Sequence, residues 1–428
     1  MPRMTARQLD TWQGQVPRQT VVPVPCCDLK TWLKRQRGSH RFYFQDRTHE
    51  VEIAAVGQLW RTTDTALARR ALAQMQAGMS GSDPATAPRL LAGVAFDPAT
   101  AWAAYGARRF WLPEAELRRV GERTWLILYH RDSLPAPQAW LPEPSAIAEP
   151  PLQLDMPLVT LQHSVSRADW ARRVDRVLEQ IRQGRLHKAV LSRCTRVRPA
   201  VAVEGLDWLR FWGTRNPGSY QFWYAPRPQD SFFGCSPERL FRLQGTELRT
   251  EALAATIARG QDPEQDRHLA RTLHQDDKSR RENDWVAQAI RAQLATLCSG
   301  LDVAESLDTV RLSRIQHLRR RMGGTLRPDR DAFDVLDALH PTPAVAGTPT
   351  VDARALIREL DGYPRGWYAG AIGWVGADAA EFSVAIRSAR RCGAQLCLYT
   401  GAGIVDGSDP DREWQELDDK LASLLPEV

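Results

Sequence analysis

Residues 366–405 read GWYAGAIGWVGADAAEFSVAIRSARRCGAQLCLYTGAGIV. This segment contains three short runs rich in aliphatic and aromatic residues, at 366–376, 381–389 and 394–405, with glycines within and between them. Runs of this length, bounded by turn residues, are typical of strands joined as hairpins. The helical patterns of the chain lie apart from these hairpins. The segment therefore predicts an α+β fold built on antiparallel sheets.

The same alternation continues upstream. Ser166 can cap a helix that carries apolar residues at positions 170, 174, 178 and 181, and Gly184 can end it. A long polar helical region is expected at about 263–297. Strand-like runs occupy 188–197, 219–225, 231–235, 239–244 and 246–254.

The first part of the chain has its own strands and helix. A strand, a turn and a second strand are expected within 41–60, a helix at 63–78 and another strand at 122–131. Residues 132–157 are rich in proline, which breaks regular structure. We therefore expect an N-terminal β-rich portion, 1–157, that ends in a linker, and a catalytic portion, 158–428, that forms one compact unit.

Composition narrows the class of protein. The chain has 428 residues, 43% hydrophobic and 25% charged, which is ordinary for a globular protein, and no apolar run is long enough to span a membrane. No apolar signal core opens the chain, and the seven cysteines form no CxxC pair, so a cytoplasmic location is expected. The net charge of +6 suits an acidic substrate, and a nucleic-acid-binding surface is the alternative.

The final helical stretch, DPDREWQELDDKL at 409–421, places two carboxylates beside its apolar stripe. Glu413, Glu416 and Lys420 share one face, because residues three and four apart are neighbours on a helix. Two carboxylates at the edge of a core repel each other and lose hydration, and a divalent cation would relieve both costs. Hard oxygen ligands of this kind suit magnesium. The alternative is a solvated face with a Glu416–Lys420 pair.

Three further positions could carry acid, base or metal chemistry. Glu282 lies just before the apolar stripe of a helix and could share a metal with the final helix, although charged helix starts are common. Lys188 opens an apolar strand and could act as a base, or hold its amine in solvent. Glu251 lies among small and apolar residues, where a carboxylic acid can stay protonated and serve as a general acid.

Two segments could bind anions. Gly401 and Gly403 would let backbone N–H groups approach an anion closely, and strand alternation directs Arg387 away from its apolar neighbours, where it could bind a carboxylate. These candidates fit an enzyme that binds a small dianionic substrate together with magnesium. They comprise a lysine base, an acid, metal-binding carboxylates and hydrogen-bond donors for carboxylates.

Eight blocks in a fixed order add a resemblance. They are SPERLFRL, TEALAAT, DDKSRREN, IQHLRRRMGG, LHPTPAVAG, RGWYAGAIGW, EFSVAIRSA and YTGAGIVDGSDPDREWQELDDK. Over about 160–428 the chain resembles the chorismate-utilising enzyme family, and within it the isochorismate synthases of the menaquinone-pathway type. The resemblance implies a layered fold with outer helices, a magnesium cofactor and a reversible conversion of chorismate to isochorismate.

The resemblance also assigns roles to residues. Lys188 matches the base that activates water for attack at carbon 2 of chorismate, and Glu251 is assigned to the acid that protonates the departing hydroxyl at carbon 4. Glu282 and Glu416 match the magnesium ligands, with Glu413 supporting through water. The expected substrate contacts are Tyr368, Arg387, Gly401, Gly403, Lys420 and His340.

Single positions distinguish the members of this family. Anthranilate synthases carry glutamine at the position of Lys188, and aminodeoxychorismate synthases carry a nucleophilic lysine at that of Ala254. Water is therefore the expected nucleophile, with no glutamine amidotransferase subunit and a monomeric chain. A salicylate synthase, which goes on to eliminate pyruvate, is the alternative. Two alanines, Ala255 and Ala346, stand where the family usually has glycine, and Ala255 could demand an unusual φ or crowd the pocket.

Overall fold

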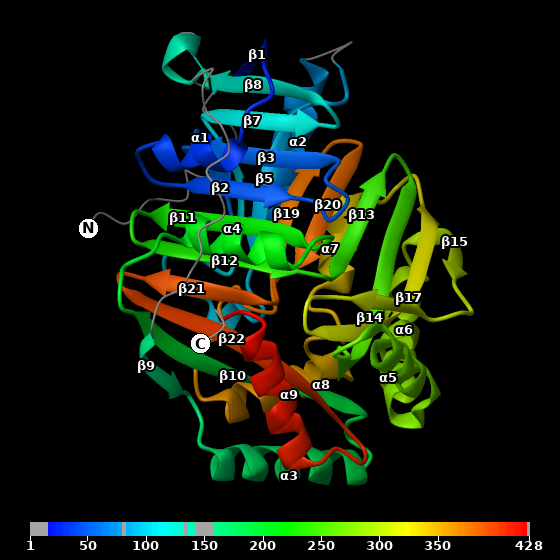
Figure 1. Ribbon diagram of the computed structural model, residues 1–428. Coiled ribbons are helices and arrows are strands. Elements are labelled where there is room, and N and C mark those ends of the chain that lie inside the picture. Colours follow the sequence, from blue (N-terminus) through cyan, green and yellow to red (C-terminus); the bar gives the residue numbers. More distant parts are fainter. Residues whose placement is uncertain (1–15, 79–82, 132–135, 143–157, 426–428) are drawn as a thin grey trace.

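The computed structural model describes residues 16–78, 83–131, 136–142 and 158–425, and it consists of two large antiparallel sheets with helices around them (Figure 1). This confirms the predicted α+β architecture. The first sheet has 12 strands in the order β1 (Arg18–Val24), β8 (Arg123–His130), β7 (Ala115–Val120), β3 (Val51–Val56), β2 (Arg41–Gln45), β11 (Tyr220–Arg227), β12 (Asp230–Ser236), β21 (Ser388–Cys392), β22 (Gln395–Val405), β10 (Lys188–Pro199) and β18 (Gly347–Thr348), with β9 (Leu158–His163) also paired to β10.

The second sheet has 10 strands. Their order is β15 (Cys298–Val303), β17 (Ile315–Leu326), β14 (Glu247–Ala258), β13 (Arg239–Gln244), β20 (Ala379–Val384), β19 (Ala371–Gly376), β5 (Arg89–Val94), β6 (Arg108–Leu112) and β4 (Trp60–Thr62), with β16 (Asp308–Arg311) paired to β17. The predicted strand at 366–376 is shorter than expected, because residues 366–370 form turns before β19 begins.

The helices cover the outer faces and edges of the sheets. They are α1 (Leu29–Arg35), α2 (Thr65–Ala77), α3 (Arg167–Arg182), α4 (Gly205–Arg215), α5 (Pro263–Gln275), α6 (Asp277–Leu294), α7 (Ala332–Leu339), α8 (Thr350–Asp361) and α9 (Pro410–Ala422). Ser166 caps α3 as predicted, since its hydroxyl accepts the Asp169 N–H. The helical region expected at 263–297 is divided at Asp276, which ends α5 and caps α6. Within the described residues, no helix is both long and apolar enough to cross a membrane.

Both sheets contain strands from both sides of residue 157. In the first sheet β2 pairs with β11, and in the second β5 pairs with β19. The largest apolar cluster includes side chains of both sheets, such as Tyr224 from β11 and Phe241 from β13. The division at 157 therefore does not coincide with a break between the sheets. Residues 143–157 of the expected linker lie outside the described residues.

The C-terminal helix packs on the strands that carry the expected site. Helix α9 lies across β22 and next to α3 (Figure 1). Trp414 and Leu417 of α9 join Trp170 of α3 in an apolar cluster that also includes residues of β10 and β22. This packing fixes the position of α9 relative to β22. It directs the side chains of Glu416 and Lys420 toward a cavity.

Candidate active site

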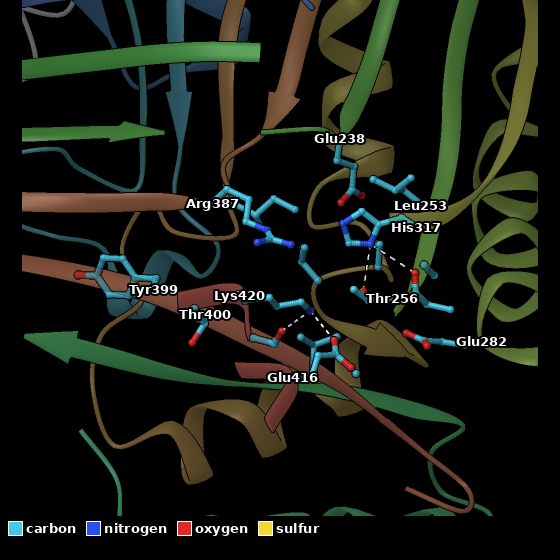
Figure 2. A pocket seen from close by; sticks show the side chains of 18 of the residues that line it. Glu238, Leu253, Thr256, Glu282, His317, Arg387, Tyr399, Thr400, Glu416 and Lys420 are labelled. Carbon is cyan, nitrogen blue, oxygen red and sulfur yellow. Dashed lines mark hydrogen bonds and ion pairs between the residues drawn. The ribbon is translucent and has the colours of Figure 1, made fainter. Parts of the chain in front are cut away.

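One cavity lies where the two sheets meet, and Glu282 of α6 and Glu416 of α9 close one side of it (Figure 2). Its wall includes residues from β10, β14, β17 and β22, from the β12–β13 and β20–β21 connections, and from the two helices. Seven of the eleven residues expected at the site line it directly: Glu282, Tyr368, Arg387, Gly401, Gly403, Glu416 and Lys420. Segments far apart in the sequence therefore converge on one polar cavity.

Lys188 is buried at the start of β10. Its side chain is 1% exposed, and its Nζ lies 2.9 Å from Oε1 of Glu282 on α6. The alternative of an amine held in solvent is therefore wrong. The burial and the carboxylate partner fix the amine next to the cavity wall that Glu282 forms.

Gly401 and Gly403 make room for these groups. A Cβ on Gly403 would lie 2.6 Å from Oε1 of Glu282 and 3.0 Å from Cε of Lys188. A Cβ on Gly401 would lie 2.7 Å from the hydroxyl oxygen of Tyr368. A side chain at either position would push Glu282 or Tyr368 out of its present place, so the two glycines leave the room that these site residues occupy.

Each carboxylate of the expected metal site is paired with a lysine. Glu282 pairs with Lys188, Glu416 lies 2.5 Å from Lys420, and Glu413 lies 2.9 Å from Lys278. Lys420 also donates to the carbonyl oxygen of Gly401 at 2.8 Å. Burial, and then the neighbouring charge of Glu416, raise the pKa of Glu413. The solvated face considered for α9 is therefore wrong for Glu413, which is buried.

These carboxylates fit a magnesium ion in part. Glu282 and Glu416 line the same cavity from two helices, and magnesium usually takes one or two carboxylates, with water and substrate oxygens in its other positions. Glu413 lies behind them and does not line the cavity. No three His, Cys, Asp or Glu side chains in the described part of the chain form a metal-binding group by themselves. Oxygens of water or substrate would have to complete the coordination.

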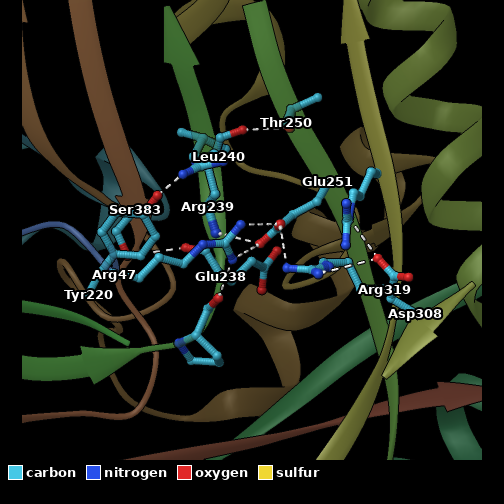
Figure 3. A network of polar contacts seen from close by, with 12 residues as sticks. Arg47, Tyr220, Glu238, Arg239, Leu240, Thr250, Glu251, Asp308, Arg319 and Ser383 are labelled. Atoms are coloured by element: carbon cyan, nitrogen blue, oxygen red, sulfur yellow. Dashed lines mark hydrogen bonds and ion pairs between the residues drawn. The ribbon is translucent and has the colours of Figure 1, made fainter. Parts of the chain in front are cut away.

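Glu251 is buried, but it does not have the raised pKa of the protonated acid that the sequence suggested. It lies on β14 outside the cavity lining, and Arg47 of the β2–β3 turn donates to both of its carboxylate oxygens at 2.6 Å (Figure 3). The N–H of Arg239 donates to Oε1 at 3.0 Å. Burial alone would raise the pKa of Glu251, but the Arg47 charge and hydrogen bonds outweigh it and lower the pKa. A carboxylate held ionised in this way is a poor proton donor.

Glu238 has the properties expected of that acid. It lies between β12 and β13, lines the cavity and is 3% exposed. Burial, and then the negative charge of Glu251, raise its pKa from 4.5 to about 8. The residue lies in the block SPERLFRL, to which the resemblance drew attention without giving the glutamate a role. Sequence analysis missed it because its burial depends on the contact between the two sheets.

His317, rather than His340, is the histidine of the cavity. His317 lies on β17 and lines the cavity, and its Nδ1 is 3.0 Å from the hydroxyl of Thr256. Burial, and then the charge of Arg387, lower its pKa well below the usual value, so the ring is neutral. His340 follows α7, and its Nε2 lies 2.9 Å from the carbonyl oxygen of Ala95. His340 is therefore not among the residues that line the cavity.

Three buried polar atoms around the cavity have no hydrogen-bond partner among the described residues. They are Nη2 of Arg387, Nε2 of His317 and Oγ1 of Thr400. The other end of the Arg387 guanidinium donates to the Ser423 hydroxyl at 2.9 Å, which holds the group in place. Buried polar groups are normally satisfied, so these three atoms indicate a polar ligand. Arg387 and Lys420 both line the cavity, and these two cations favour an anionic ligand.

Ala255 shows how the chain accommodates its departure from the usual glycine. It has a φ of 68° and is the extra residue of a bulge in β14, between Ala254, which pairs with Leu318 of β17, and Thr256, which pairs with His317. Left-handed backbone at a non-glycine residue is strained, and alanine has the smallest side chain that bears this strain. Ala346 is fully buried and is not among the residues with a positive φ.

Comparison with known proteins agrees with this arrangement. Residues 5–428 match the family described as chorismate binding enzyme, which extends the resemblance to the N-terminal portion. The chain is 35% identical to the isochorismate synthase MenF of Escherichia coli K12, over 93% of this chain and 90% of that protein. It is 31% identical to the isochorismate synthase MenF of Pasteurella multocida, over 98% and 95%.

Solved structures give the same result. The menaquinone-specific isochorismate synthase MenF of Escherichia coli superposes with a TM-score of 0.83 at 33% identity, over 98% of this chain and 96% of that one. Anthranilate synthase component I from Streptococcus pneumoniae shares the fold, with a TM-score of 0.71 at 21% identity over 91% and 95%. With a family match over nearly the whole length, the chain belongs to the chorismate binding enzyme family.

Proposed function

We propose that this protein is an isochorismate synthase, an isomerase that converts chorismate to isochorismate. The observation that carries the proposal is Glu238, a buried carboxylic acid whose pKa is raised to about 8. It lines the same cavity as Glu282, the ion-pair partner of Lys188. The reaction adds one hydroxyl group and removes another. It therefore requires a base, here Lys188, and an acid that is protonated near neutral pH, here Glu238.

Each residue of the cavity has its own role in the proposed reaction. Lys188 accepts a proton from the water that attacks carbon 2, and Glu238 donates a proton to the hydroxyl that leaves carbon 4. Arg387 and Lys420 bind the carboxylates of the substrate, and the neutral ring of His317 contributes a hydrogen bond from Nε2. Ala254 lines the cavity with a methyl group and leaves no second amine to compete with water as the nucleophile.

Magnesium belongs to the proposal as a cofactor. Bound by Glu282 and Glu416, it would supply positive charge for a substrate carboxylate. Because Glu282 is the ion-pair partner of Lys188, a cation bound to this carboxylate would compete with the lysine for it. The menaquinone pathway, the monomeric state and the cytoplasmic location stay predictions.

The test is to incubate the protein with chorismate, with and without magnesium, and to separate the products by chromatography. We expect isochorismate in equilibrium with chorismate, no pyruvate, and dependence on magnesium. Salicylate with pyruvate would instead identify the salicylate synthase reaction. The Lys188→Ala variant should lose turnover and keep the circular dichroism spectrum of the parent protein.

A further inference from the structure

Two cysteines lie next to each other on the strands that also form the active site. Cys194 is on β10 and Cys397 is on β22. In the pairing of these strands Cys194 lies opposite Tyr399, and Cys397 lies opposite Arg196. The two cysteines are therefore diagonal neighbours on one face of the sheet.

Their side chains meet at the edge of the main apolar core. Cys194 is 5% exposed and belongs to this core, and Cys397 packs against it while remaining partly exposed. Each thiol shifts the pKa of the other, as expected of side chains that lie close together on one face of the sheet. Both are free thiols.

The surroundings distinguish the two thiols. The hydrogen bond from Cys194, together with the charges of Arg196 and Arg390, lowers the pKa of Cys397 to about 7, although burial acts against this. The shared hydrogen bond and burial raise the pKa of Cys194. The thiolate is the reactive form of cysteine, and a partly exposed thiolate beside arginines is the usual environment of an oxidation-sensitive one.

We propose that Cys397 is a site of reversible oxidation and that Cys194 captures the oxidised sulfur as a disulfide. With hydrogen peroxide as the oxidant, the Cys397 thiolate attacks one peroxide oxygen and the O–O bond breaks. This gives a sulfenic acid at Cys397 and one water after protonation. The sulfur of Cys194 then attacks the Cys397 sulfur and displaces the second water. Two thiols are oxidised and one peroxide is reduced to two waters.

A disulfide between Cys194 and Cys397 would lie next to residues that line the cavity. Lys188, Val190 and Cys194 lie on the same face of β10, because side chains of a strand alternate. Tyr399, opposite Cys194, lines the cavity and stacks on Tyr368 with ring centroids 4.9 Å apart. The bond would tie together β10 and β22, which carry Lys188 and the two site glycines. The inference does not depend on which reaction the cavity catalyses.

The test maps oxidised cysteines in the full-length protein. The reduced protein is treated with one to several equivalents of hydrogen peroxide, free thiols are alkylated, and peptides are identified by mass spectrometry with and without dithiothreitol. We expect a Cys194–Cys397 cross-linked peptide that dithiothreitol removes. Oxidation of the exposed Cys26 or Cys392, with Cys194 and Cys397 both alkylated, would overturn the proposal.

Two variants separate the roles of the thiols. In Cys194→Ser the sulfenic acid of Cys397 has no partner, so dimedone should label Cys397. In Cys397→Ser the Cys194 thiol should stay reduced at the same peroxide concentration. Cys392→Ser is the matched control, since Cys392 is exposed at the end of β21, and it should form the cross-link as the parent protein does. Equal dimedone labelling of Cys397 in parent and Cys194→Ser proteins would also contradict the proposal.

Discussion

Glu238 shows at the scale of one residue how burial prepares an acid. Its carboxyl keeps its proton up to a pH of about 8, so turnover should fall as the pH rises through that value. We expect Glu238→Gln to lower kcat by about 10²–10⁴-fold, the usual contribution of general acid catalysis. Steady-state rates from pH 6 to 9.5 would measure both effects. The Glu251→Gln variant should keep the decrease of turnover at alkaline pH. If this decrease disappeared in Glu251→Gln and not in Glu238→Gln, the acid would be Glu251.

The same residue links stability to pH. The folded state holds the Glu238 proton up to about pH 8, whereas the unfolded chain releases it near 4.5. Between these values the unfolded state binds fewer protons, so this group lowers the free energy of unfolding as the pH rises. Urea unfolding at pH 5 and pH 8 should show a smaller loss of stability for Glu238→Gln than for the parent protein. Identical losses in the two proteins would show that the carboxyl is ionised in the fold.

Ala255 tests the left-handed backbone of the bulge. At a φ of 68° a β-branched side chain is strongly disfavoured, whereas glycine fits without strain. Ala255→Val should therefore lower the free energy of unfolding by about 1–3 kcal/mol and reduce turnover, since the Ala255 carbonyl lies 3.3 Å from Nδ1 of His317. Ala255→Gly should unfold within about 1 kcal/mol of the parent protein. Chemical denaturation measures both, and a well-tolerated valine would show that the bulge relaxes.

At the scale of the elements, α6 and α9 bring carboxylates and lysines together. Magnesium should raise the melting temperature of the protein, because an ion bound only to the fold stabilises it. Removing a ligand, as in Glu282→Gln, should weaken magnesium binding at least roughly tenfold by calorimetry. Asp284→Asn on the same helix is the matched control, since Asp284 is half exposed and pairs with Arg320. Equal magnesium affinity in the two variants would remove Glu282 from the ligand set.

The elements also show what could be predicted from sequence. The cap at Ser166 and the α9 stripe follow local rules, and the structure confirms them. The hairpins of 366–405 are confirmed as well, except that the run at 381–389 is divided between β20 and β21, which lie in different sheets. The Arg47 partner of Glu251 could not be predicted, because small and apolar neighbours along a strand do not reveal a residue from another segment. Glu238 and His317 were missed because a raised acid pKa and an unpartnered ring nitrogen arise only when distant strands meet.

At the scale of the whole molecule, the Arg47–Glu251 pair joins the first portion of the chain to the second sheet. Both side chains are largely buried, at 12% and 3% exposure. Arg47→Ala therefore leaves a buried carboxylate with only the Arg239 N–H and, at 3.9 Å, the Arg319 guanidinium. We expect this change to cost about 3–5 kcal/mol of unfolding free energy. The double change Arg47→Met with Glu251→Leu should recover most of that loss, because it removes both charges and keeps volume.

The Arg242–Glu50 pair provides the matched control for this prediction. It connects the same β2–β3 turn to the second sheet, but its Glu50 side chain is 59% exposed. Exposed pairs contribute little, so Arg242→Ala should change the unfolding free energy by less than about 1 kcal/mol. Denaturant titrations of the four proteins, parent included, measure the difference. If Arg47→Ala cost no more than Arg242→Ala, the two portions of the chain would be joined by their shared sheets alone, and the buried pair would serve chiefly to keep Glu251 ionised.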